Sequence, residues 1–387
     1  MRIQYITNVR LPTAKAQGYA IMKMCSEFTR AGIQTELFVP RRTNFEIQED
    51  PFEHYGIEKN FKIRKIFNFD LLGRTLKFGQ IFYWIDIVVF IFVLQWTVTF
   101  RSDDVIYTRD FVLASFFSKK QHVCLEIHAI PKSRFLFQRA LKKASVFVVL
   151  NNYLKQALIE RGVPSTRIVV APSAVDMTEF PGGEQSCEVP GLNTGDFVYG
   201  YVGTLKTMGM EKGVELGLQA LALLPTKCKF LIVGGEPDEV TYYKRIAEQL
   251  GVVDRAIFVG KVPHLSRSTY ISVCNVLIAP FPENEHYSYF MSPLKIFEYM
   301  ASKKPIVATD LPTLREVLTN GENAILIPPN SAQYLAQAVI RLQEDPEYST
   351  KLLEKAYTDV LQKYTWEKRV THILEKIRSL VSVTEMI

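Results

Sequence analysis

The stretch Ser292-Pro-Leu-Lys-Ile-Phe-Glu-Tyr-Met-Ala-Ser-Lys-Lys-Pro-Ile-Val-Ala308 contains the sequence pattern of a helix followed directly by that of a strand. Residues 294–301 have the apolar spacing of a helix, and Pro293 suits a helix start because an N–H at that position has no intrahelical partner. The run 305–308 is short, apolar and β-branched, which is typical of a buried strand. A helix followed at once by a strand is the repeating unit of a parallel sheet covered by helices.

The same alternation extends outward in both directions, so the sequence predicts an α/β fold. In the second half, strands are expected at 197–202, 229–233, 256–259, 276–279, 305–308 and 324–327, and helices at 213–224, 240–250, 294–301 and 331–343. In the first half, strands are expected at 2–6, 35–39, 104–107, 123–127, 146–150 and 168–171, with helices such as 20–31 and 153–161 between them.

The two halves are separated by residues 181–196, PGGEQSCEVPGLNTGD, which are rich in Pro, Gly and polar residues and lack apolar periodicity. We therefore predict a Rossmann-like domain over 1–180, a linker over 181–196 and a second Rossmann-like domain over 197–363. Residues 364–387 are expected to form a helix that packs back across the domain junction. Ligands of such sheets bind at the carboxyl ends of the strands, so two domains facing one another would enclose a cleft.

Composition narrows the class of protein. The 387 residues carry 46 Lys and Arg against 40 Asp and Glu, and 48% are hydrophobic, which excludes a globally disordered chain. Residues 1–180 hold 25 basic and 16 acidic side chains, so the first domain is basic and suits an anionic partner. No aromatic and basic nucleic-acid module accompanies this charge, and nucleic acid is not expected. Five widely spaced cysteines without C-x-x-C favour a reducing cytosol.

Residues 81–100, IFYWIDIVVFIFVLQWTVTF, have the length of a membrane span. Asp86 in the middle would be costly in lipid. The favoured interpretation is a hydrophobic helix packed inside the domain, and a helix lying in the membrane interface or a true span remain as alternatives. Basic residues just upstream would attract anionic lipid, although they could also form an ordinary solvated face: Lys59, Lys62, Arg64, Lys65, Arg74 and Lys77.

The helix over 294–301 carries the strongest chemical signal. The free amides of its first turn and its dipole favour an anion, most naturally a phosphate, and Lys295 can add a charge to the same group. Glu298 lies about one turn further along the same face, where it could accept hydrogen bonds from the hydroxyls of an attached sugar. The alternative is an ordinary capped helix with a solvated Glu298.

Two further loops follow predicted first strands. In 201–213, Gly203 and Gly209 permit close approach of a ligand, and Lys206 and Lys212 could neutralise a diphosphate. In 8–18, Gly18 is again a candidate for close approach. This loop lacks G-x-G-x-x-G, so a dinucleotide-dependent oxidoreductase is not expected.

His128 comes at the end of a predicted strand, a position that suits function, although a lone histidine can equally be structural. No pair of His or Cys residues has metal-ligand spacing, and Asp-x-Asp and Gly-x-Ser-x-Gly are absent. The sequence therefore predicts metal-free chemistry that is not serine hydrolysis.

Taken in order, these motifs resemble the retaining, nucleotide-sugar-dependent glycosyltransferases of the GT-B fold, of the group-1 (family four) class. The resemblance covers nearly the whole chain and rests on residues 10–18, 107–110, 126–128, 172–180, 203–213, 233–235, 258–260 and 292–301, with 304–308 behind them. It implies an acceptor-binding N-terminal domain, a C-terminal domain that binds a nucleotide-diphosphate sugar, and an α-linkage formed with retention and without a metal cofactor.

The resemblance also implies residue roles. Glu298 would hold the ribose hydroxyls, Lys212 the diphosphate, and His128 would reach the donor sugar; these three are the expected catalytic residues. The backbone near Val262 would contact the base. The full set expected to bind the donor is Gly18, Gly203, Thr204, Lys206, Lys212, Val262, Ser292, Pro293, Leu294, Lys295 and Glu298.

Three positions depart from the family pattern: Phe290 stands where a Glu is usual, Thr204 where a basic residue is usual, and Ser173-Ala174 where Asn-Gly is usual. The expected function is a cytoplasmic glycosyltransferase of cell-envelope glycan synthesis. It would extend a glycan or lipid-linked acceptor at the cytosolic membrane face, where an anionic surface could hold it as a peripheral protein. Because of Phe290 and Thr204, the alternative is a nucleotide-sugar-binding protein with lost or altered transferase activity.

Overall fold

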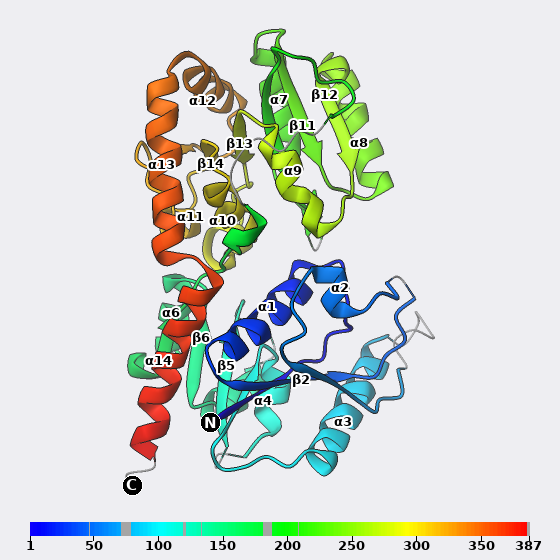
Figure 1. The fold of residues 1–387 in the computed structure, drawn as a ribbon, viewed down its shortest axis with the longest axis vertical. Coiled ribbons are helices and arrows are strands. Elements are labelled where there is room, and N and C mark those ends of the chain that lie inside the picture. The colour runs from blue at the N-terminus through cyan, green and yellow to red at the C-terminus, as the bar shows by residue number, and fades with distance from the viewer. Residues whose placement is uncertain are drawn as a thin grey trace. The chain divides into compact units, whose positions relative to one another are not determined.

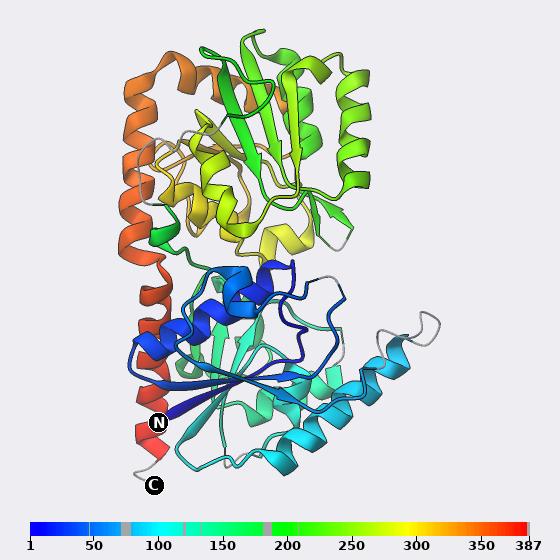
Figure 2. The ribbon, with the colours of Figure 1, turned by 45° about the vertical axis from the view of Figure 1, so that its right-hand side comes forward.

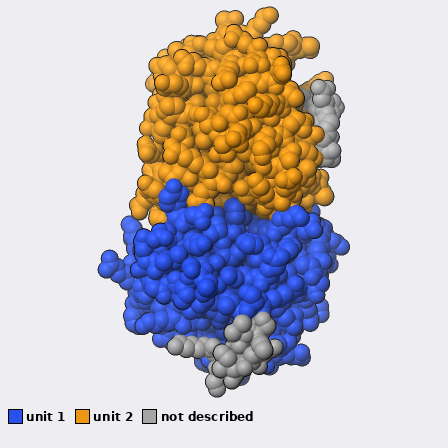
Figure 3. All heavy atoms as spheres, turned by 90° about the vertical axis from the view of Figure 1, so that its left-hand side faces the viewer, with its two compact units in different colours: residues 1–172, 366–387 blue, residues 173–365 orange. Residues whose placement is uncertain are grey.

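A computed structural model describes residues 1–45, 47–70, 79–118, 121–132, 134–180, 188–207 and 209–384. The chain forms two compact units (Figure 3). Unit 1 comprises Met1–Pro172 together with Trp366–Ile387, and unit 2 comprises Ser173–Thr365. The boundary therefore falls ahead of the predicted linker. Within that linker, residues 188–196 form loop and turn, and residues 181–187 lie outside the described residues.

Unit 1 is built on a seven-stranded parallel sheet in the order β3-β2-β1-β4-β5-β6-β7 (Figure 1). Its strands are β1 Arg2–Ile6, β2 Gln34–Pro40, β3 Lys62–Ile66, β4 Asp104–Thr108, β5 His122–Ile127, β6 Val146–Val149 and β7 Ile168–Val170. The sequence missed β3, because its pattern Lys-Ile-Arg-Lys-Ile carries three charges. As the edge strand, β3 exposes Lys62, Arg64 and Lys65, and such charges protect an open edge from further pairing.

The helices of unit 1 are α1 Ala16–Arg30, α2 Pro51–Tyr55, α3 Gly79–Thr97, α4 Phe111–Phe116, α5 Arg134–Lys143, α6 Asn152–Ile159 and α14 Trp366–Thr384. Helix α14 lies within the tail for which a helix was expected over 364–387, and it packs on α1, β6 and β7. Its apolar stripe, Val370, Ile373, Leu374 and Ile377, is buried. The last helix of the chain is thus an integral part of unit 1.

Unit 2 is built on a six-stranded parallel sheet in the order β12-β11-β8-β13-β14-β15. The course of this unit can be followed from green to orange in Figure 2. Its strands are β8 Phe197–Val202, β11 Cys228–Val233, β12 Ala256–Gly260, β13 Val276–Ala279, β14 Ile306–Thr309 and β15 Ile325–Ile327, with a small hairpin of β9 Lys206–Thr207 and β10 Met210–Glu211. Its helices are α7 Val214–Leu223, α8 Pro237–Gln249, α9 Arg267–Ser272, α10 Leu294–Ala301, α11 Pro312–Arg315, α12 Ala332–Glu344 and α13 Pro346–Lys363.

Both sheets have the strand order of a Rossmann fold, as the sequence predicts. In each sheet the order reverses beside the first strand, between β1 and β4 in unit 1 and between β8 and β13 in unit 2. The loops that leave neighbouring strands diverge at such a reversal and open a crevice at the carboxyl edge of the sheet. In unit 2, the loops that begin at Gly203 and Pro280 are the ones that diverge.

The segment over 81–100 forms α3, which packs on β3. One of its faces is buried through Ile87, Phe90 and Leu94, and Asp86 is fully enclosed. The opposite face is apolar but exposed, with Phe92 at 70% and Trp96 at 82%. Among the described residues, no helix is both long enough and apolar enough to span a membrane. The expectation of a packed helix therefore holds for one face of α3 only.

Candidate active site

Among the described residues, no side chain caps the main-chain amides at the start of α10. Pro293 is the residue just before the helix, with φ −77° and ψ 125°, rather than a residue of its first turn, and its side chain has no group that could cap it. The N-terminal amides of a helix lack intrahelical acceptors, and together with the helix dipole they favour an anion. The geometry needed for the predicted phosphate site is therefore present at α10.

Lys295 is buried beside these amides. Its Nζ lies 3.3 Å from the centroid of the Tyr201 ring and 5.5 Å from that of Phe281. Among the described residues, Nζ has no hydrogen-bond partner. Burial and the charge of Lys212 lower the pKa of Lys295 well below its ordinary value. A buried amine with no partner is rare in folded proteins and is the type of group that an anionic ligand would satisfy.

The loop after β8 brings further predicted residues to Lys295. Gly203 has φ +141°, and a Cβ at this position would lie 3.2 Å from Cε of Lys295, so a side chain here would crowd the lysine. Nζ of Lys212 donates to Oγ1 of Thr204 at 2.6 Å. Burial lowers the pKa of Lys212 to about 8. Gly203, Thr204, Lys212 and Lys295 thus form one cationic cluster at the reversal of strand order.

Glu298 is buried, with 4% of its surface exposed, so the interpretation as a solvated glutamate is wrong. Its Oε1 lies 3.0 Å from Nη2 of Arg267 on α9. Its Oε2 is buried and has no hydrogen-bond partner among the described residues. Burial raises the pKa of this carboxyl, although Arg267 acts in the opposite direction. One carboxylate oxygen therefore remains available to accept hydrogen bonds from a ligand hydroxyl.

Arg267 was not identified from the sequence. Its guanidinium hydrogen-bonds to the ring of His264, which follows the loop containing Val262, and His264 in turn lies 3.2 Å from Glu179. This chain of contacts fixes the orientation of Arg267 and hence of the Glu298 carboxylate. Val262 is partly buried and packs on the core of unit 2. No local motif marks Arg267, since its partner is far away in the sequence.

Three of the residues predicted to bind the donor contact other parts of the protein instead of joining the cluster around Lys295. Nζ of Lys206 lies 4.6 Å from the centroid of the Tyr242 ring, so this side chain does not join the cluster with Lys295. Oγ of Ser292 accepts a hydrogen bond from the Ser173 amide at 2.8 Å and so holds the chain near 173. The sequence predicted that Gly18 lies in the loop ahead of the helix, but Gly18 lies inside the first turn of α1.

The space beside Gly18 is filled by protein. A Cβ at this position would lie 2.1 Å from Oη of Tyr55 and 2.6 Å from Cγ2 of Thr13. Oη of Tyr55 donates to the Thr13 carbonyl at 2.8 Å and accepts from its amide at 2.7 Å. The space that a side chain at Gly18 would fill is therefore occupied by Tyr55, and donor binding at Gly18 stays a prediction.

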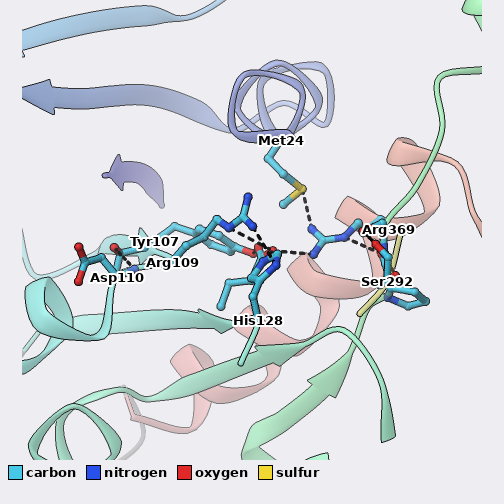
Figure 4. A network of polar contacts seen from close by, with 11 residues as sticks. Met24, Tyr107, Arg109, Asp110, His128, Ser292 and Arg369 are labelled. Carbon is cyan, nitrogen blue, oxygen red and sulfur yellow. Dashed lines mark hydrogen bonds and ion pairs between the residues drawn. The ribbon is translucent and has the colours of Figure 1, made fainter. Parts of the chain in front are cut away.

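His128 follows β5 in unit 1 and is held on both ring nitrogens (Figure 4). Its Nε2 lies 2.6 Å from Oε1 of Glu126, and its Nδ1 lies 2.8 Å from Nη2 of Arg109. Since a carboxylate only accepts and a guanidinium only donates, the ring carries its proton on Nε2. Burial and the Arg109 charge lower the pKa of His128 to about 4, so the ring is neutral at physiological pH.

Glu126 is the centre of this network. Besides His128, its carboxylate accepts from Nη2 of Arg369 at 3.0 Å and from the Tyr107 hydroxyl. Burial disfavours its charge, but Arg369, the His128 hydrogen bond and Arg109 hold its pKa well below the ordinary value. Glu126 and His128 are two residues apart and so share a face where β5 ends, which the sequence could have indicated. No sequence pattern indicated that Arg369 on α14 belongs to this network.

Arg369 has each of its nitrogens engaged. Nε donates to the Pro172 carbonyl at 2.8 Å, and Nη1 lies 2.8 Å from Sδ of Met24 (Figure 4). The Arg369 side chain is 4% exposed. Arg369 therefore ties the C-terminal helix to the strand end that carries His128, all within unit 1.

Comparison with known proteins agrees with these features. Residues 196–345 match the family described as glycosyl transferases, group 1. The chain is 30% identical over 168 residues to the α-D-kanosaminyltransferase of Streptomyces kanamyceticus, covering 43% of this chain and 41% of that protein. It is 26% identical over 274 residues to the D-inositol 3-phosphate glycosyltransferase of Corynebacterium urealyticum, covering 67% and 62%. The chain thus spans less than two thirds of these curated relatives.

Solved structures match over almost the full length. A crystal structure of Anabaena HepE in complex with UDP superimposes with a TM-score of 0.71 at 17% identity, covering 98% of this chain and 100% of that chain. Sucrose-phosphate synthase from Thermosynechococcus elongatus matches with a TM-score of 0.75 at 18% identity and covers 99% of both chains. Two parallel Rossmann-like units and these neighbours define the GT-B fold. Over residues 196–345, which make up most of unit 2, the chain matches the group-1 glycosyltransferase family.

Proposed function

We propose that the protein is a retaining glycosyltransferase that moves a sugar from a nucleoside-diphosphate sugar to a glycan or lipid-linked acceptor. The observation that carries the proposal is a pair of buried groups on α10 that have no hydrogen-bond partner within the described residues, Nζ of Lys295 and Oε2 of Glu298. A diphosphate is the natural partner of the first and a ribose hydroxyl that of the second. The structures of Anabaena HepE with UDP and with UDP-glucose make UDP-glucose the first donor to test.

In this proposal, unit 2 stabilises the leaving group. Negative charge accumulates on the distal phosphate as the bond to the sugar breaks, and the α10 amides, Lys295 and Lys212 are positioned to stabilise it. These fixed dipoles and cations need no reorganisation during the reaction. We propose that they neutralise the diphosphate without a resident metal ion, so activity is expected to survive chelation by EDTA.

Unit 1 would supply the acceptor side and the neutral His128. Because Nε2 and Nδ1 are both engaged by protein groups, His128 is poorly suited to act as a general base in this arrangement. We propose that it acts as a neutral group whose orientation Glu126 and Arg109 fix. Proton removal from the acceptor then falls to the departing phosphate, in keeping with transfer with retention.

We further propose that unit 1 works at the cytosolic face of a membrane. The exposed face of α3 presents Trp84, Val88, Phe92 and Trp96 at helical spacing, with Ile85 beside Trp84. Trp residues near each end of an apolar helix favour the membrane interface. The neighbouring edge strand β3 exposes Lys62, Arg64 and Lys65, which complement anionic head groups. An anionic lipid surface is therefore the partner that this face fits.

Flotation with vesicles tests the membrane proposal. The wild-type protein should float with vesicles containing anionic lipid and less well with neutral vesicles. The double variant Phe92→Ser/Trp96→Ser should remain in the soluble fraction, whereas Tyr334→Ser, which removes an exposed aromatic from α12 in unit 2, should float like the wild type. Equal flotation of the wild type and the double variant would refute the proposed surface.

The transferase assignment is tested by turnover of a panel of UDP-, GDP- and ADP-sugars, with and without EDTA. One or more donors should be consumed, by transfer or by slow hydrolysis. Glu298→Ala should abolish this consumption, while Glu354→Ala, an exposed glutamate on α13, should have no effect. Tight binding of a nucleotide sugar with no turnover would instead support the alternative of a binding protein. Full activity of Glu298→Ala would refute the assigned site.

A further inference from the structure

Unit 1 contains a pocket of about 680 Å³ that begins just after the end of β5. Its lining residues come from the loop behind His128, the first turns of α5 and the segment after α6: Ile130, Pro131, Lys132, Arg134, Phe137, Gln138, Glu160 and Arg161. A volume of this size is typical of a small-molecule site. The pocket is separate from the cationic cluster of unit 2, which serves the donor in the proposed function.

The charge of the pocket is positive and largely unneutralised. Within the part of the chain that the structure describes, the exposed side chains of Lys132 and Arg134 make no ion pair or hydrogen bond. Nη1 of Arg161 donates to the Ala157 carbonyl at 2.6 Å, and Arg161 forms no ion pair with any carboxylate that the structure describes. The carboxylate in the lining, Glu160, accepts from Gln156 at 3.2 Å. Three basic side chains against one acidic side chain favour an anionic ligand.

The pocket also has an apolar component. Phe137 is buried, with 3% of its surface exposed, and Ile130 and Pro131 are half-buried. Guanidinium groups bind phosphate through paired N–H donors, which is a geometry that Arg134 and Arg161 can provide. Apolar walls next to such donors suit a phosphate that carries a hydrocarbon or the apolar face of a sugar.

We propose that this pocket binds the phosphate-bearing part of the acceptor, so that the acceptor is a phosphorylated molecule. The role of the ligand as an acceptor rests on the proposed glycosyl transfer, but the anion site itself does not. His128 precedes Ile130 by two residues, so the pocket adjoins the strand end where unit 1 presents its candidate reaction residues. A lipid-linked diphosphate and a soluble sugar phosphate share this chemistry.

Calorimetric titration without any donor tests the pocket directly. The probes are decyl diphosphate below its micelle concentration, glucose 1-phosphate, and uncharged decyl maltoside. At least one of the two phosphates should bind, and decyl maltoside should bind at least tenfold more weakly than that phosphate. Tighter binding of decyl diphosphate identifies a lipid-linked source, and tighter binding of glucose 1-phosphate identifies a soluble one. Binding of decyl maltoside as tight as that of both phosphates would overturn the proposal.

Variants locate the binding. The triple variant Lys132→Ala/Arg134→Ala/Arg161→Ala should weaken phosphate binding at least tenfold, and the effect should shrink at high salt. A control with the same loss of charge outside the pocket is Lys142→Ala/Lys143→Ala/Lys155→Ala, which should bind like the wild type. Equal binding by the two triple variants would refute the pocket. Titration of the same proteins with UDP distinguishes the donor site of unit 2 from the anion pocket of unit 1. Failure of the wild type to bind UDP would refute the donor site and leave the pocket unaffected.

Discussion

Replacing Lys295 with Met should make unit 2 more stable and at the same time impair donor binding. Nζ of Lys295 is buried without a hydrogen-bond partner among the described residues and lies over the Tyr201 ring. A buried polar group without a partner costs about 1–3 kcal/mol, which the substitution would remove. Methionine has a similar linear shape and makes favourable sulfur contacts with aromatic rings. The hydrogen bond from Lys295 to the diphosphate would be charge-assisted and worth about 1.5–3 kcal/mol, so its removal should raise the Kd for UDP roughly 10- to 150-fold.

Two measurements on one protein preparation decide this prediction. Differential scanning calorimetry should show a rise in the Tm of unit 2 of about 2–12 °C, given about 2–4 °C per kcal/mol for a unit of this size. Isothermal titration should show the weaker UDP affinity. Lys206→Met is the matched control, because Lys206 lies over Tyr242 and away from the cluster, and its UDP affinity should change by less than about threefold. A Lys295→Met protein that is less stable yet binds UDP normally would show that the lysine is a structural residue.

Three other predictions follow from the same network of interactions. The pKa of Lys212 is about 8 and its charged form binds phosphate, so the affinity of the wild type for UDP should fall about tenfold between pH 7 and pH 9. Lys212→Arg should flatten this pH profile, and a Lys212→Arg profile like that of the wild type would contradict the role of Lys212. Arg369→Met should destabilise unit 1 by about 3–5 kcal/mol by removing the closest cation from the buried Glu126 carboxylate, measured by urea unfolding with tryptophan fluorescence, since all three Trp residues lie in unit 1; the double variant with Glu126→Gln should be less destabilised, and equal losses would contradict the buried pair. Gly18→Ala should destabilise unit 1 through the clash with Tyr55, and adding Tyr55→Phe should restore part of the stability; a loss of UDP affinity with no loss of stability would contradict the role of Gly18 in packing against Tyr55.

The sequence was most informative where a local pattern determines the structure. The α10 segment and most strands of both sheets follow from apolar periodicity. Gly203 was identified as a glycine that permits close approach after a predicted strand, but its proximity to Lys295 was not predicted. The edge strand β3 was missed because its side chains are mostly exposed and charged, so no buried face appears in the pattern. The unit boundary was placed too late, because the loop-rich composition of 181–196 does not mark where the packing of the chain passes from one unit to the other.

The remaining site features depend on partners that are distant in the chain. Glu126 is held by Arg369 across 243 positions, and no spacing rule connects them. Arg267 orients Glu298, although α9 itself carries no recognisable motif. His128 was identified as a candidate by its place at a strand end, but only its hydrogen bonds with Glu126 and Arg109 reveal that both of its nitrogens are engaged. Local patterns thus located the elements of the site, while the electrostatic state of each group depends on the tertiary fold.

In the proposed donor site, Glu298 binds the ribose of a nucleoside diphosphate whose phosphates lie on α10. The sharpest test is a titration of wild type and Glu298→Gln with UDP and with 2′,3′-dideoxy-UDP. We expect the substitution to weaken binding of UDP about tenfold or more and to leave binding of the dideoxy nucleotide nearly unchanged, because Glu298 would hydrogen-bond only to the ribose hydroxyls. Equal weakening for the two nucleotides, or no weakening for either, would contradict this role of Glu298.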